Sequence, residues 1–472
     1  MRSLVWFRRD LRVNDNQALH HATQNATDGT VALFIITPQQ WLSHDDAAVK
    51  ISFWLRNLRS LSESLAKLNI PLTVKTCDTF DDVPDVVVKV AKTNRCDHLC
   101  FNREYEINEA RRDNAVMTAC QRSDIAVQRF HDRVIVPPRE IETGGGNFYK
   151  VYTPYRKVWN QKAFGRAEVF PTPKKQKKID VKPSKIPTKV KGFDLSNARE
   201  DLWIAGEEEA GKRLKEFSDR IKQYDEARDI PCINGTSLIS PYLAAGVISP
   251  RQCLAAARGS NAQQIGGESG ASVWISELTW RDFYVHVMIG FPRVSMHQPF
   301  KLKTEKIDWR TSKKDLQAWK DGQTGYPIVD AGMRQLKQTG WMHNRLRMVT
   351  AMFLTKNLLI DWRLGEKHFM KTLVDGDLAA NNGGWQWSAS TGTDAVPYFR
   401  IFNPFSQSKR FDKEGKFIKK MCPELESIPA IQLHDPKKLT DAIEKHHVDY
   451  PAMVVDYKAG RERALAAFKS LD

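Results

Sequence analysis

Short apolar runs alternate with longer amphipathic stretches over the first 130 residues of the chain. Each apolar run has the length of a buried strand. The runs are residues 4–7, 31–37, 71–77, 98–102 and 125–130. Between two of them, residues 49–68 place Leu and Ile three and four positions apart, which predicts an amphipathic helix. Strand–helix alternation of this kind predicts a doubly wound parallel sheet in an α/β domain.

The turn after the first predicted strand lacks the fingerprint of a dinucleotide-binding domain. The sequence there is Arg8-Arg-Asp-Leu-Arg12, with no G-x-G-x-x-G. The glycines of that fingerprint let a diphosphate approach the backbone closely. We therefore expect that this domain does not hold a nucleotide in the usual Rossmann way.

From about residue 201 the pattern changes to long helices with few strand signals. The predicted helices are residues 207–230, 250–258, 270–290, 313–321, 327–339, 343–360 and 366–374. Residues 131–200 lack this periodicity and contain a Pro- and Lys-rich segment at 171–191, which is typical of a linker. We therefore expect an α/β domain over residues 1–131, a connection over 132–200 and an all-α domain over 201–472.

The net charge of +16 lies almost entirely in the later part of the chain. Residues 1–130 hold 17 Lys and Arg against 16 Asp and Glu, which leaves 55 against 40, or +15, for residues 131–472. The segment 171–191 alone has eight Lys and one acidic residue, Asp180. This asymmetry indicates a polyanionic partner, although a basic surface that only keeps the protein dissolved has the same composition.

Membrane, secreted and metal-binding classes are disfavoured by the sequence. The longest apolar runs are too short to span a bilayer, and the first residues show no signal-peptide pattern. Seven Cys form no C-x-x-C pair and twelve His include no H-E-x-x-H, so we expect reduced thiols and no metal. These features predict a cytoplasmic protein without a membrane partner.

Residues 341–400 combine Trp with Asn, Asp and Arg, and eight of the 13 Trp lie between Trp274 and Trp387. Buried polar side chains cost free energy unless each has a partner. Gly383 and Gly384 remove two Cβ atoms, which lets the backbone approach a ligand. The mixture predicts a site for a flat, polar, aromatic ligand, and the alternative is a polar turn beside a Trp-rich core.

Three hydroxyls, those of Thr236, Ser237 and Ser240, follow a glycine and precede a helical stretch. Hydroxyls and unpaired backbone N–H groups at a helix start suit a diphosphate. Ordinary helix capping needs only one such residue and explains the same pattern.

The predicted helix at 270–290 places Trp274, Glu277, Arg281 and Tyr284 on one face, with Trp280 on its flank. A carboxylate on a basic surface can accept hydrogen bonds from base edges, and an exposed indole can stack on a base. An intrahelical Glu277–Arg281 salt bridge beside core tryptophans explains the same spacing.

Asp375 and Asp377 flank Gly376, so both carboxylates lie near one turn. Such a pair can do acid–base work, bind a metal, or accept hydrogen bonds from an imide N–H or ribose hydroxyls. Glycosidase-like chemistry is conceivable, but no partner motif supports it.

At these residues the chain closely resembles the photolyase/cryptochrome flavoproteins, and within them the bacterial class I cyclobutane pyrimidine dimer DNA photolyases. The likeness covers nearly the whole chain and runs through residues 6–12, 236–240, 274–284, 325–330, 341–348 and 375–400. The stretch from Asp375 to Trp387, D-G-D-L-A-A-N-N-G-G-W-Q-W, is specific to the family. The resemblance implies an N-terminal α/β domain and a C-terminal helical domain that holds FAD folded in a U shape.

The resemblance also assigns the FAD ligands. The diphosphate side would be held by Tyr224, Thr236, Ser237, Leu238 and Ser240. The isoalloxazine and ribose would be lined by Trp274, Arg281, Asn344, Arg347, Asp375, Gly376 and Asp377. Asn381 would face the flavin N5, where an amide can donate or accept a hydrogen bond.

DNA, an electron relay and a second chromophore are implied in the same way. A flipped lesion and its DNA strand would contact Arg228, Glu277, Trp280, Asn344, Arg345, Met348, Trp387 and Gln407. Trp385, Trp362 and Trp309 match a relay that carries an electron to oxidised flavin, although core packing also explains them. His44, Asn108 and Glu109 match the site of a folate antenna, 5,10-methenyltetrahydrofolate. Ser295-Met296 stands where some relatives have a Lys, so 8-hydroxy-5-deazaflavin is the alternative antenna.

The function implied is that of a carbon–carbon lyase that splits cyclobutane pyrimidine dimers in UV-damaged DNA by electron transfer from photoexcited, reduced FAD. We expect a monomer with access to the nucleoid. A cryptochrome-type blue-light receptor is one alternative, but such receptors tend to have an acid or Cys at the position of Asn381. A (6-4) photolyase is another, and that subgroup is expected to have His where this chain has Asn344 and Met348. A DNA-binding flavoprotein without catalysis is a third.

Overall fold

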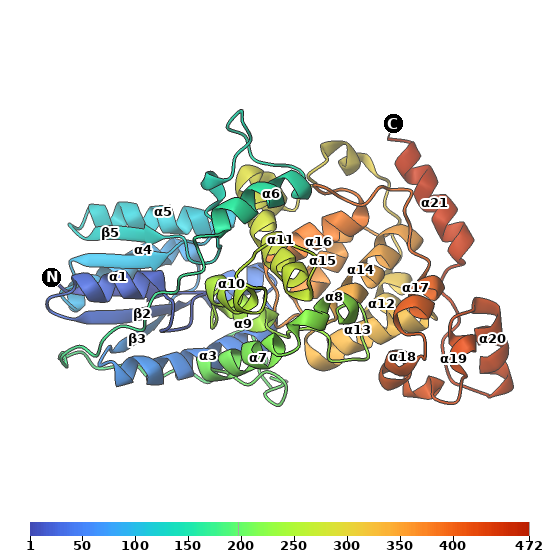
Figure 1. Cartoon of the computed structure of the whole chain (residues 1–472), viewed down its shortest axis with the longest axis horizontal. Coiled ribbons are helices and arrows are strands. Elements are labelled where there is room, and N and C mark those ends of the chain that lie inside the picture. The colour runs from blue at the N-terminus through green and yellow to red at the C-terminus, as the bar shows by residue number, and fades with distance from the viewer. Residues whose placement is uncertain (197, 472) are drawn as a thin grey trace. The chain divides into compact units, whose positions relative to one another are not determined.

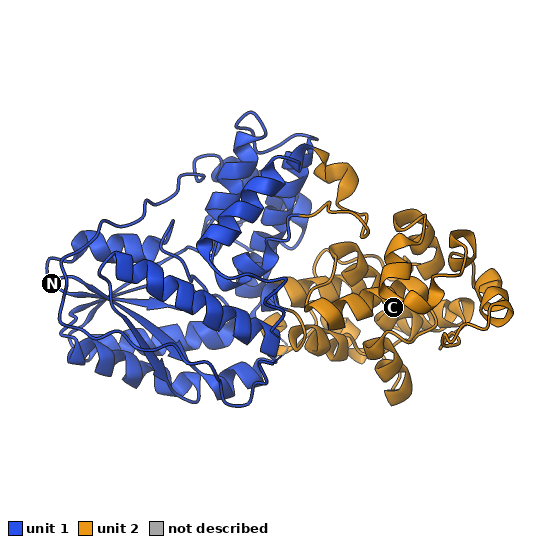
Figure 2. Ribbon diagram, turned by 90° about the horizontal axis from the view of Figure 1, so that it is seen from below, with its two compact units in different colours: residues 1–222, 237–292, 374–379 blue, residues 223–236, 293–373, 380–472 orange. Residues whose placement is uncertain are grey.

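The computed structural model describes residues 1–196 and 198–471. The chain divides into two compact units, coloured separately in Figure 2. Unit 1 comprises residues 1–222, 237–292 and 374–379, and unit 2 comprises residues 223–236, 293–373 and 380–472. These divisions do not follow the predicted domain limits, since unit 1 also takes in residues 237–292. The domain limits stay a prediction.

A five-stranded parallel sheet lies in the N-terminal part of unit 1 (Figure 1), as the alternating pattern predicts. The strands are β1 (Ser3–Phe7), β2 (Thr30–Ile36), β3 (Leu72–Thr76), β4 (His98–Asn102) and β5 (Ala126–Phe130). Their order is β3-β2-β1-β4-β5. The chain passes from β1 to β2 and β3 and then returns to β4, so the topological switch point lies between β1 and β4. Ligands of open α/β sheets bind outside the carboxyl ends of the strands at such a point.

Helices connect the strands of this sheet. They are α1 (Gln17–Asn25), α2 (Pro38–Ser43), α3 (Ala48–Lys67), α4 (Val83–Thr93) and α5 (Ile107–Gln121). Leu4, Trp6, Leu33 and Leu99 are fully buried in the core of this part of unit 1. The apolar runs fix these strands because burial of both faces of a parallel sheet demands continuous apolar sequence.

The rest of unit 1 is helical. Its helices are α6 (Tyr152–Ala163), α7 (Glu207–Ser218), α9 (Ser240–Ala245), α10 (Pro250–Gly259) and α11 (Gly270–Gly290). The predicted helix over 207–230 is wrong in length, because α7 ends at Ser218. A 3₁₀ turn (Ile221–Gln223) and α8 (Tyr224–Ala227) follow it. A Cβ at Gly270 would lie 2.3 Å from the carbonyl oxygen of Ile221, so the interruption lets the start of α11 pack against this turn.

Unit 2 is helical throughout, and no strand follows β5 in the described parts of the chain. Its helices include α12 (Lys313–Asp321), α13 (Pro327–Thr339), α14 (Asn344–Met352), α15 (Trp362–Met370), α17 (Pro404–Phe411), α18 (Lys416–Met421), α19 (Ala430–Leu433), α20 (Pro436–Lys445) and α21 (Tyr457–Lys469). Helix α16 (Leu378–Ala389) begins in unit 1 and continues in unit 2. No helix of the described residues is long and apolar enough to cross a membrane.

Two predicted helices of unit 2 have different limits in the structure. The one over 343–360 is α14 followed by a π-helical turn (Phe353–Asn357). The one over 366–374 lies four residues earlier as α15, because the Asp361 side chain accepts a hydrogen bond from the N–H of Arg363 and caps that helix. The fold class of the prediction, a doubly wound parallel sheet followed by a helical region, is confirmed.

Candidate functional site

Five charged side chains lie at the switch point of the sheet in unit 1. Arg9 follows β1, and its Nε and Nη2 atoms lie 2.5 Å from Glu104 and 2.6 Å from Glu106. The guanidinium of Arg133 lies 3.1 Å from the same Glu106 and 2.7 Å from Asp377. Arg9 also approaches Asp377 to 3.7 Å. Two guanidinium groups are therefore shared between Glu106 and Asp377.

This network keeps Asp377 ionised. Burial alone raises the pKa of a carboxyl group, but the positive charges of Arg133 and Arg9 outweigh it and lower the pKa of Asp377. The resemblance assigns Asp377 to the flavin, whereas Arg9, Glu106 and Arg133 are not among the residues assigned. These three charged residues follow β1, β4 and β5 within four residues of the strand ends. Because the carboxyl ends of parallel strands lie at one edge of the sheet, that position in the sequence could have indicated them.

The turn that contains Asp375, Gly376 and Asp377 is held by two further contacts within unit 1. Lys50 Nζ donates to the carbonyl oxygen of Gly376 at 2.6 Å and lies 2.5 Å from Asp46. The Ser240 hydroxyl donates to Asp375 at 2.6 Å. Both carboxylates of the pair are therefore fixed by hydrogen bonds, as groups that recognise a ligand need to be.

The hydroxyl cluster is not explained by helix capping. The N-cap residue of α9 is Ile239, whose side chain caps nothing. Ser240 is the first residue of the helix, and its hydroxyl binds Asp375. Leu238 has a φ of 51°, an unusual conformation for a branched side chain that marks a tight bend. Thr236 belongs to unit 2 and Ser237 to unit 1.

Helix α11 carries the predicted base reader and flavin residues. Trp274 is buried and packs against Phe217, with ring centroids 5.0 Å apart. The Arg281 guanidinium donates to the carbonyl oxygen of Arg133, which connects α11 to the switch-point network. Glu277 is half-buried on the same helix.

Asp282, which the sequence patterns did not single out, fixes α11 in place. Its carboxylate accepts hydrogen bonds from the backbone of Ile135 and Val136 and from the Trp159 indole, at 2.9, 3.2 and 2.9 Å. Burial raises the pKa of Asp282 to about 6 in spite of the nearby Arg281. These bonds connect α11 to residues 135–136 and to α6.

Trp280 is stacked on Tyr152 within unit 1. The ring centroids are 3.6 Å apart and the planes differ by 5°. The Tyr152 hydroxyl bonds to the backbone and side-chain oxygens of Ser276 at 3.0 and 2.7 Å. One face of the predicted stacking indole is therefore already covered, and its plane is fixed by a partner that the resemblance does not assign.

The three residues assigned to the antenna lie together in unit 1. Asn108 Nδ2 is 3.0 Å from His44 Nε2, and His44 Nδ1 is 3.5 Å from Glu109. Burial, followed by the negative charge of Glu106, raises the pKa of Glu109 to about 8, against the effect of Arg9. Glu109 is thus mostly protonated at neutral pH and can donate a hydrogen bond.

In unit 2, Asn381 and its neighbours form a chain of amide hydrogen bonds. Asn381 Nδ2 donates to the backbone oxygen of Glu366 at 3.0 Å. Asn382 Nδ2 donates to the Glu366 carboxylate at 2.8 Å and accepts from Gln386 at 2.9 Å. Within the described residues Asn381 keeps its amide oxygen and its second N–H for a ligand.

The three tryptophans assigned to the relay differ in burial. Trp385 and Trp362 are fully buried in the core of unit 2, whereas Trp309 is half-buried at its margin. A Cβ at Gly365 would lie 2.1 Å from Trp385 Cη2, so this glycine lets α15, which begins with Trp362, reach the Trp385 ring. Trp309 is therefore the member of the three that reaches the surface.

Arg345, assigned to DNA phosphates, is already paired within unit 2. Its guanidinium makes two bonds to the Asp229 carboxylate, at 2.7 and 3.3 Å, and covers the Phe411 ring at 4.3 Å. Asp229 was not singled out from the sequence. The other assigned DNA residues of unit 2 differ in exposure: Asn344 is exposed, and Arg228, Met348, Trp387 and Gln407 are half-buried.

The predicted flavin residues fall in both units. Unit 1 contains Ser237, Leu238, Ser240, Trp274, Arg281, Asp375, Gly376 and Asp377, and unit 2 contains Tyr224, Thr236, Asn344, Arg347 and Asn381. No group of three or more metal-binding side chains occurs among the residues that the structure describes, and the seven cysteines are free thiols.

Comparison with known proteins supplies the family. A model of the FAD binding domain of DNA photolyase matches residues 274–470, and a DNA photolyase model matches residues 3–175. Deoxyribodipyrimidine photo-lyase of Escherichia coli K12 is 43% identical over 469 residues, which cover 99% of this chain and 98% of that protein. The chain belongs to the photolyase/cryptochrome family.

Solved structures of photolyase/cryptochrome proteins agree with this fold. A bacterial class III photolyase from Agrobacterium tumefaciens is 35% identical with a TM-score of 0.89, covering 99% of this chain and 97% of that one. A cryptochrome from Synechocystis sp. PCC6803 is 26% identical with a TM-score of 0.85, covering 99% of each chain. The chain thus has the FAD-binding domain of photolyases, while the individual ligand assignments stay predictions.

Proposed function

We propose that this protein is a deoxyribodipyrimidine photolyase, an enzyme that uses light to split cyclobutane pyrimidine dimers in DNA. The observation that carries the proposal is the 43% identity to deoxyribodipyrimidine photo-lyase over 99% of the chain. The cryptochrome with the same fold is less similar, at 26% identity. In addition, Asn381 stands where cryptochromes tend to have an acid or a Cys.

The polar groups assigned to the flavin in unit 1 and in unit 2 have the hydrogen-bonding properties that a flavin ring needs. Asp377 is a fixed anion that can accept a hydrogen bond from an imide N–H, and Asn381 offers both an acceptor and a donor to a ring nitrogen. FAD, when bound in its reduced form, supplies the electron for the dimer after it absorbs light. The residues of the chain supply position and charge. Arg133 and Arg9 hold Asp377, and Glu366 holds Asn381.

The lesion would be read by residues of α11 together with residues of α14 and α16. A dimer must leave the base stack to be reached, and a damaged pair is easier to extrude. Trp280, and Trp387 on α16, would provide an apolar wall. Glu277 would bind a thymine N3–H or, if protonated, a carbonyl oxygen that gains negative charge. Asn344 and Met348, one turn apart on α14, would complete the contacts.

We propose Trp385, Trp362 and Trp309 as the path that carries an electron to oxidised flavin. The burial of the first two and the partial exposure of the third support Trp309 as the outer end of the path. We also propose that His44, Asn108 and Glu109 bind a folate antenna, with a deazaflavin as the alternative. Extraction of the chromophores from the purified protein and their absorption spectra decide between the two.

We further propose a monomer that acts in the cytoplasm with access to the nucleoid. Size-exclusion chromatography of the purified protein tests the first point. Elution as a dimer at low concentration would contradict it.

The function is tested by illuminating chemically reduced protein with three matched oligonucleotides. One contains a cyclobutane dimer, one a (6-4) lesion and one no damage, and each has a dark control. We expect restoration of the cyclobutane dimer alone, and only in the light. Restoration of the (6-4) lesion would make the protein a (6-4) photolyase. Light-dependent flavin changes without any repair would favour a cryptochrome-type receptor.

A further inference from the structure

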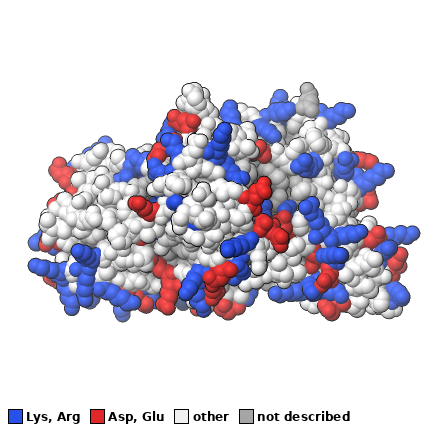
Figure 3. All heavy atoms as spheres, in the orientation of Figure 1, with Lys and Arg blue, Asp and Glu red and all other residues white. Residues whose placement is uncertain are grey.

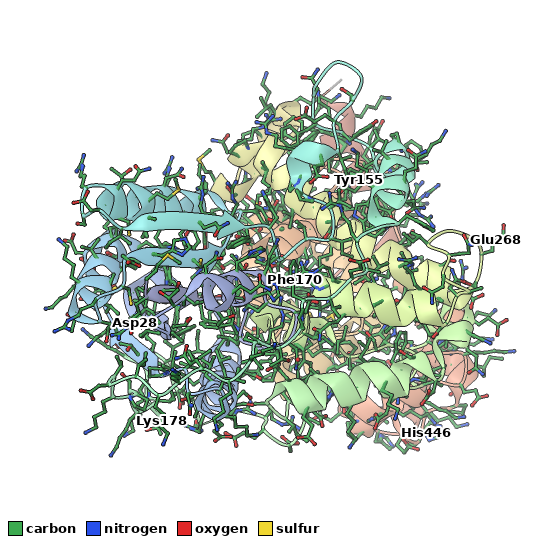
Figure 4. All side chains as sticks on the ribbon, turned by 60° about the vertical axis from the view of Figure 1, so that its left-hand side comes forward. Asp28, Tyr155, Phe170, Lys178, Glu268 and His446 are labelled. Carbon is green, nitrogen blue, oxygen red and sulfur yellow. The ribbon has the colours of Figure 1, made fainter. Side chains whose placement is uncertain are left out.

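Residues 171–191 form a strap along unit 1 whose charge the proposed mechanism does not use. This lysine strap has eight Lys against Asp180 alone, a net charge of +7 in 21 residues. It contains no helix or strand. Figure 4 labels Lys178 in the strap and Asp28 in the nearby turn before β2.

Side-chain hydrogen bonds pin the strap to the β2–β3 side of the sheet. Gln176 accepts from the N–H of Thr30 at 2.7 Å and donates to the backbone oxygens of Thr30 and Asn69 at 3.0 and 2.8 Å. Farther along, the N–H of Ser184 donates to Leu72 at 2.8 Å, and its hydroxyl accepts from Val74 at 3.0 Å. The strap is therefore an ordered strip that covers the edge strand β3.

The apolar residues of the strap face the protein. Ile179 and Val181 pack on the core of the α/β part, and a Cβ at Gly29 would lie 2.8 Å from Ile179 Cγ2. Gly29 has a φ of 88°, a conformation that glycine adopts without strain. Its missing side chain leaves the room that Ile179 needs, so the strap has one defined inner side.

The lysines of the strap point to solvent. Lys174, Lys175, Lys177, Lys178, Lys182, Lys185, Lys189 and Lys191 are all exposed. None of the eight has an ion-pair partner among the described residues. Lys67 at the end of α3 and Lys75 in β3 are exposed nearby, while Asp28 is paired with Arg2 at 2.8 Å. Figure 3 shows Lys and Arg gathered over the end of unit 1 where Figure 1 places β3 and the strap.

Protection of the sheet edge does not require so much charge. A covering loop is itself enough to protect an edge strand, and here the strap backbone already covers β3. Seven net positive charges on an ordered strip repel one another, and a polyanion relieves that repulsion while releasing its own counterions. Because the strap is already ordered, binding costs little conformational entropy.

We propose that the lysine strap is a second DNA-binding surface that contacts the phosphate backbone of undamaged duplex DNA without reading its sequence. The proposal rests on the proposed function, which makes DNA the polyanion this protein meets. Lysine is a point charge that binds phosphate without specifying a base. An anionic membrane fits less well, because Ile179 and Val181 face the core and leave no apolar side to insert. Contacts of this kind would keep the enzyme on undamaged DNA while it searches for a lesion.

The test replaces Lys174, Lys175, Lys177 and Lys178 together by Gln, with the same four positions changed to Arg as a control. Binding of the full-length protein to a long undamaged duplex is measured by fluorescence anisotropy at several salt concentrations. We expect the Gln variant to lose up to about 3.6 from the slope of log K against log salt, since each phosphate contact contributes about 0.9. The Arg variant should keep the parental slope. A second variant should also lower the slope of log K against log salt. It replaces Lys182, Lys185, Lys189 and Lys191 by Gln.

Repair of a short single-stranded oligonucleotide with one dimer separates this proposal from the function itself. The Gln variants should repair it at the parental rate, because the strap does not touch the lesion. If repair is normal and the slope for undamaged duplex is also unchanged, the strap proposal is wrong and the function stands. If neither the parent nor the variants repair the dimer, but the Gln variants have a smaller salt slope for undamaged duplex, the proposed function is wrong and the DNA-binding surface stands. The strap proposal would also be overturned if the Gln variants lost binding to phosphatidylserine vesicles but kept parental binding to DNA.

Discussion

The residues assigned to function have opposite surroundings in the two units. In unit 1, Asp377 lies in a buried network of charges in which Arg9 and Arg133 both contact Glu106 and Asp377. In unit 2, Trp362 and Trp385 lie among buried apolar side chains. Fixed charges suit the orientation of a polar ring and of the phosphates and ribose of a cofactor, whereas an apolar core holds tryptophan rings by packing. On the proposed assignments, the charges of unit 1 would position the cofactor, and the tryptophans of unit 2 would also carry an electron.

Unit 2 also contains a buried lysine. Lys356 donates to the Ser390 hydroxyl at 2.8 Å and lies 3.6 Å from the centroid of Phe468. Burial, followed by the charge of Lys301, lowers the pKa of Lys356 well below its usual value.

The largest effect is expected at the margin of the unit 2 core. Trp309→Phe should abolish light-driven reduction of oxidised flavin while repair by chemically reduced protein stays nearly intact. Absorption spectra during illumination measure the first property, and dimer loss measures the second. Trp341→Phe, outside the assigned path, is the matched control and should reduce its flavin like the parent. Normal photoreduction in the Trp309 variant would show that the path is misassigned.

The second-largest effect is expected from a substitution in the charged network of unit 1. Arg133→Ala removes the guanidinium that lies 2.7 Å from Asp377 and leaves Arg9, 3.7 Å away, as the shared cation, and breaking such a buried pair costs about 3–5 kcal/mol. We expect that loss in urea unfolding, together with loss of FAD from the purified protein. Arg139, which is exposed and paired with Glu142 at 3.1 Å, gives the control, since Arg139→Ala should cost less than about 1 kcal/mol. Equal effects of the two substitutions would show that the network does not have the stabilising role proposed for it.

Glu277 separates a reader of the lesion from a partner within its helix. A buried hydrogen bond to a charged group contributes about 1.5–3 kcal/mol, whereas an exposed pair one turn apart on a helix contributes about 0.2–0.5 kcal/mol. Glu277→Ala should therefore retain FAD and the fold but repair fewer dimers per absorbed photon. Quantum-yield measurements on reduced protein check this. A parental yield would leave only the structural role.

The stack of Tyr152 on Trp280 should have a smaller effect, confined to DNA binding. An aromatic pair contributes about 0.5–1.5 kcal/mol, so Tyr152→Leu should weaken binding of dimer-containing DNA about 2- to 12-fold with the yield per bound dimer unchanged. Tyr152→Phe keeps the ring and should bind like the parent. Trp280→Ala removes the wall itself and should weaken binding at least as much. If Tyr152→Phe is as weak as Tyr152→Leu, the hydroxyl bond to Ser276 is responsible in place of the stack.

The smallest effect expected is a pH dependence that comes from Glu109. Its folded pKa of about 8 exceeds the ordinary value of 4.5, so between these values the folded state binds the extra proton. Stability from this group is complete below the ordinary pKa and is lost as pH rises through 8. Glu109→Gln should therefore be more stable than the parent at high pH and flatten the curve of urea midpoint against pH. Parallel curves for the two proteins would contradict the raised pKa.

The sequence predicted the strands closely because apolar runs report burial directly. The run at 98–102 became β4 without change, and the helix at 49–68 became α3 with a shift of one residue. Helix limits set by tertiary contact were not predictable, as at Gly270, whose approach to Ile221 interrupts the helical pattern after α7. Local periodicity contains no information about such an approach.

The candidate site shows the same division. Asp375, Asp377 and Asn381 stand out because polar residues beside Trp and Gly are unusual in a core. The partners Arg133 and Glu366 do not stand out, because they look like ordinary surface charges in sequence. Arg133 comes from a distant part of the chain, and Glu366 comes from the preceding helix α15. Asp229 is a similar case, since only the structure shows that it pairs with Arg345.

The central claim is that this chain converts light into dimer splitting, and a count of split dimers tests it most directly. Chemically reduced protein is mixed with an equal amount of an oligonucleotide that contains one cyclobutane dimer, and intact bases are quantified by chromatography after illumination or darkness. The account predicts that nearly every bound dimer is restored in the light and none in the dark. Dimers that persist in the light while FAD and oligonucleotide are both bound would contradict it.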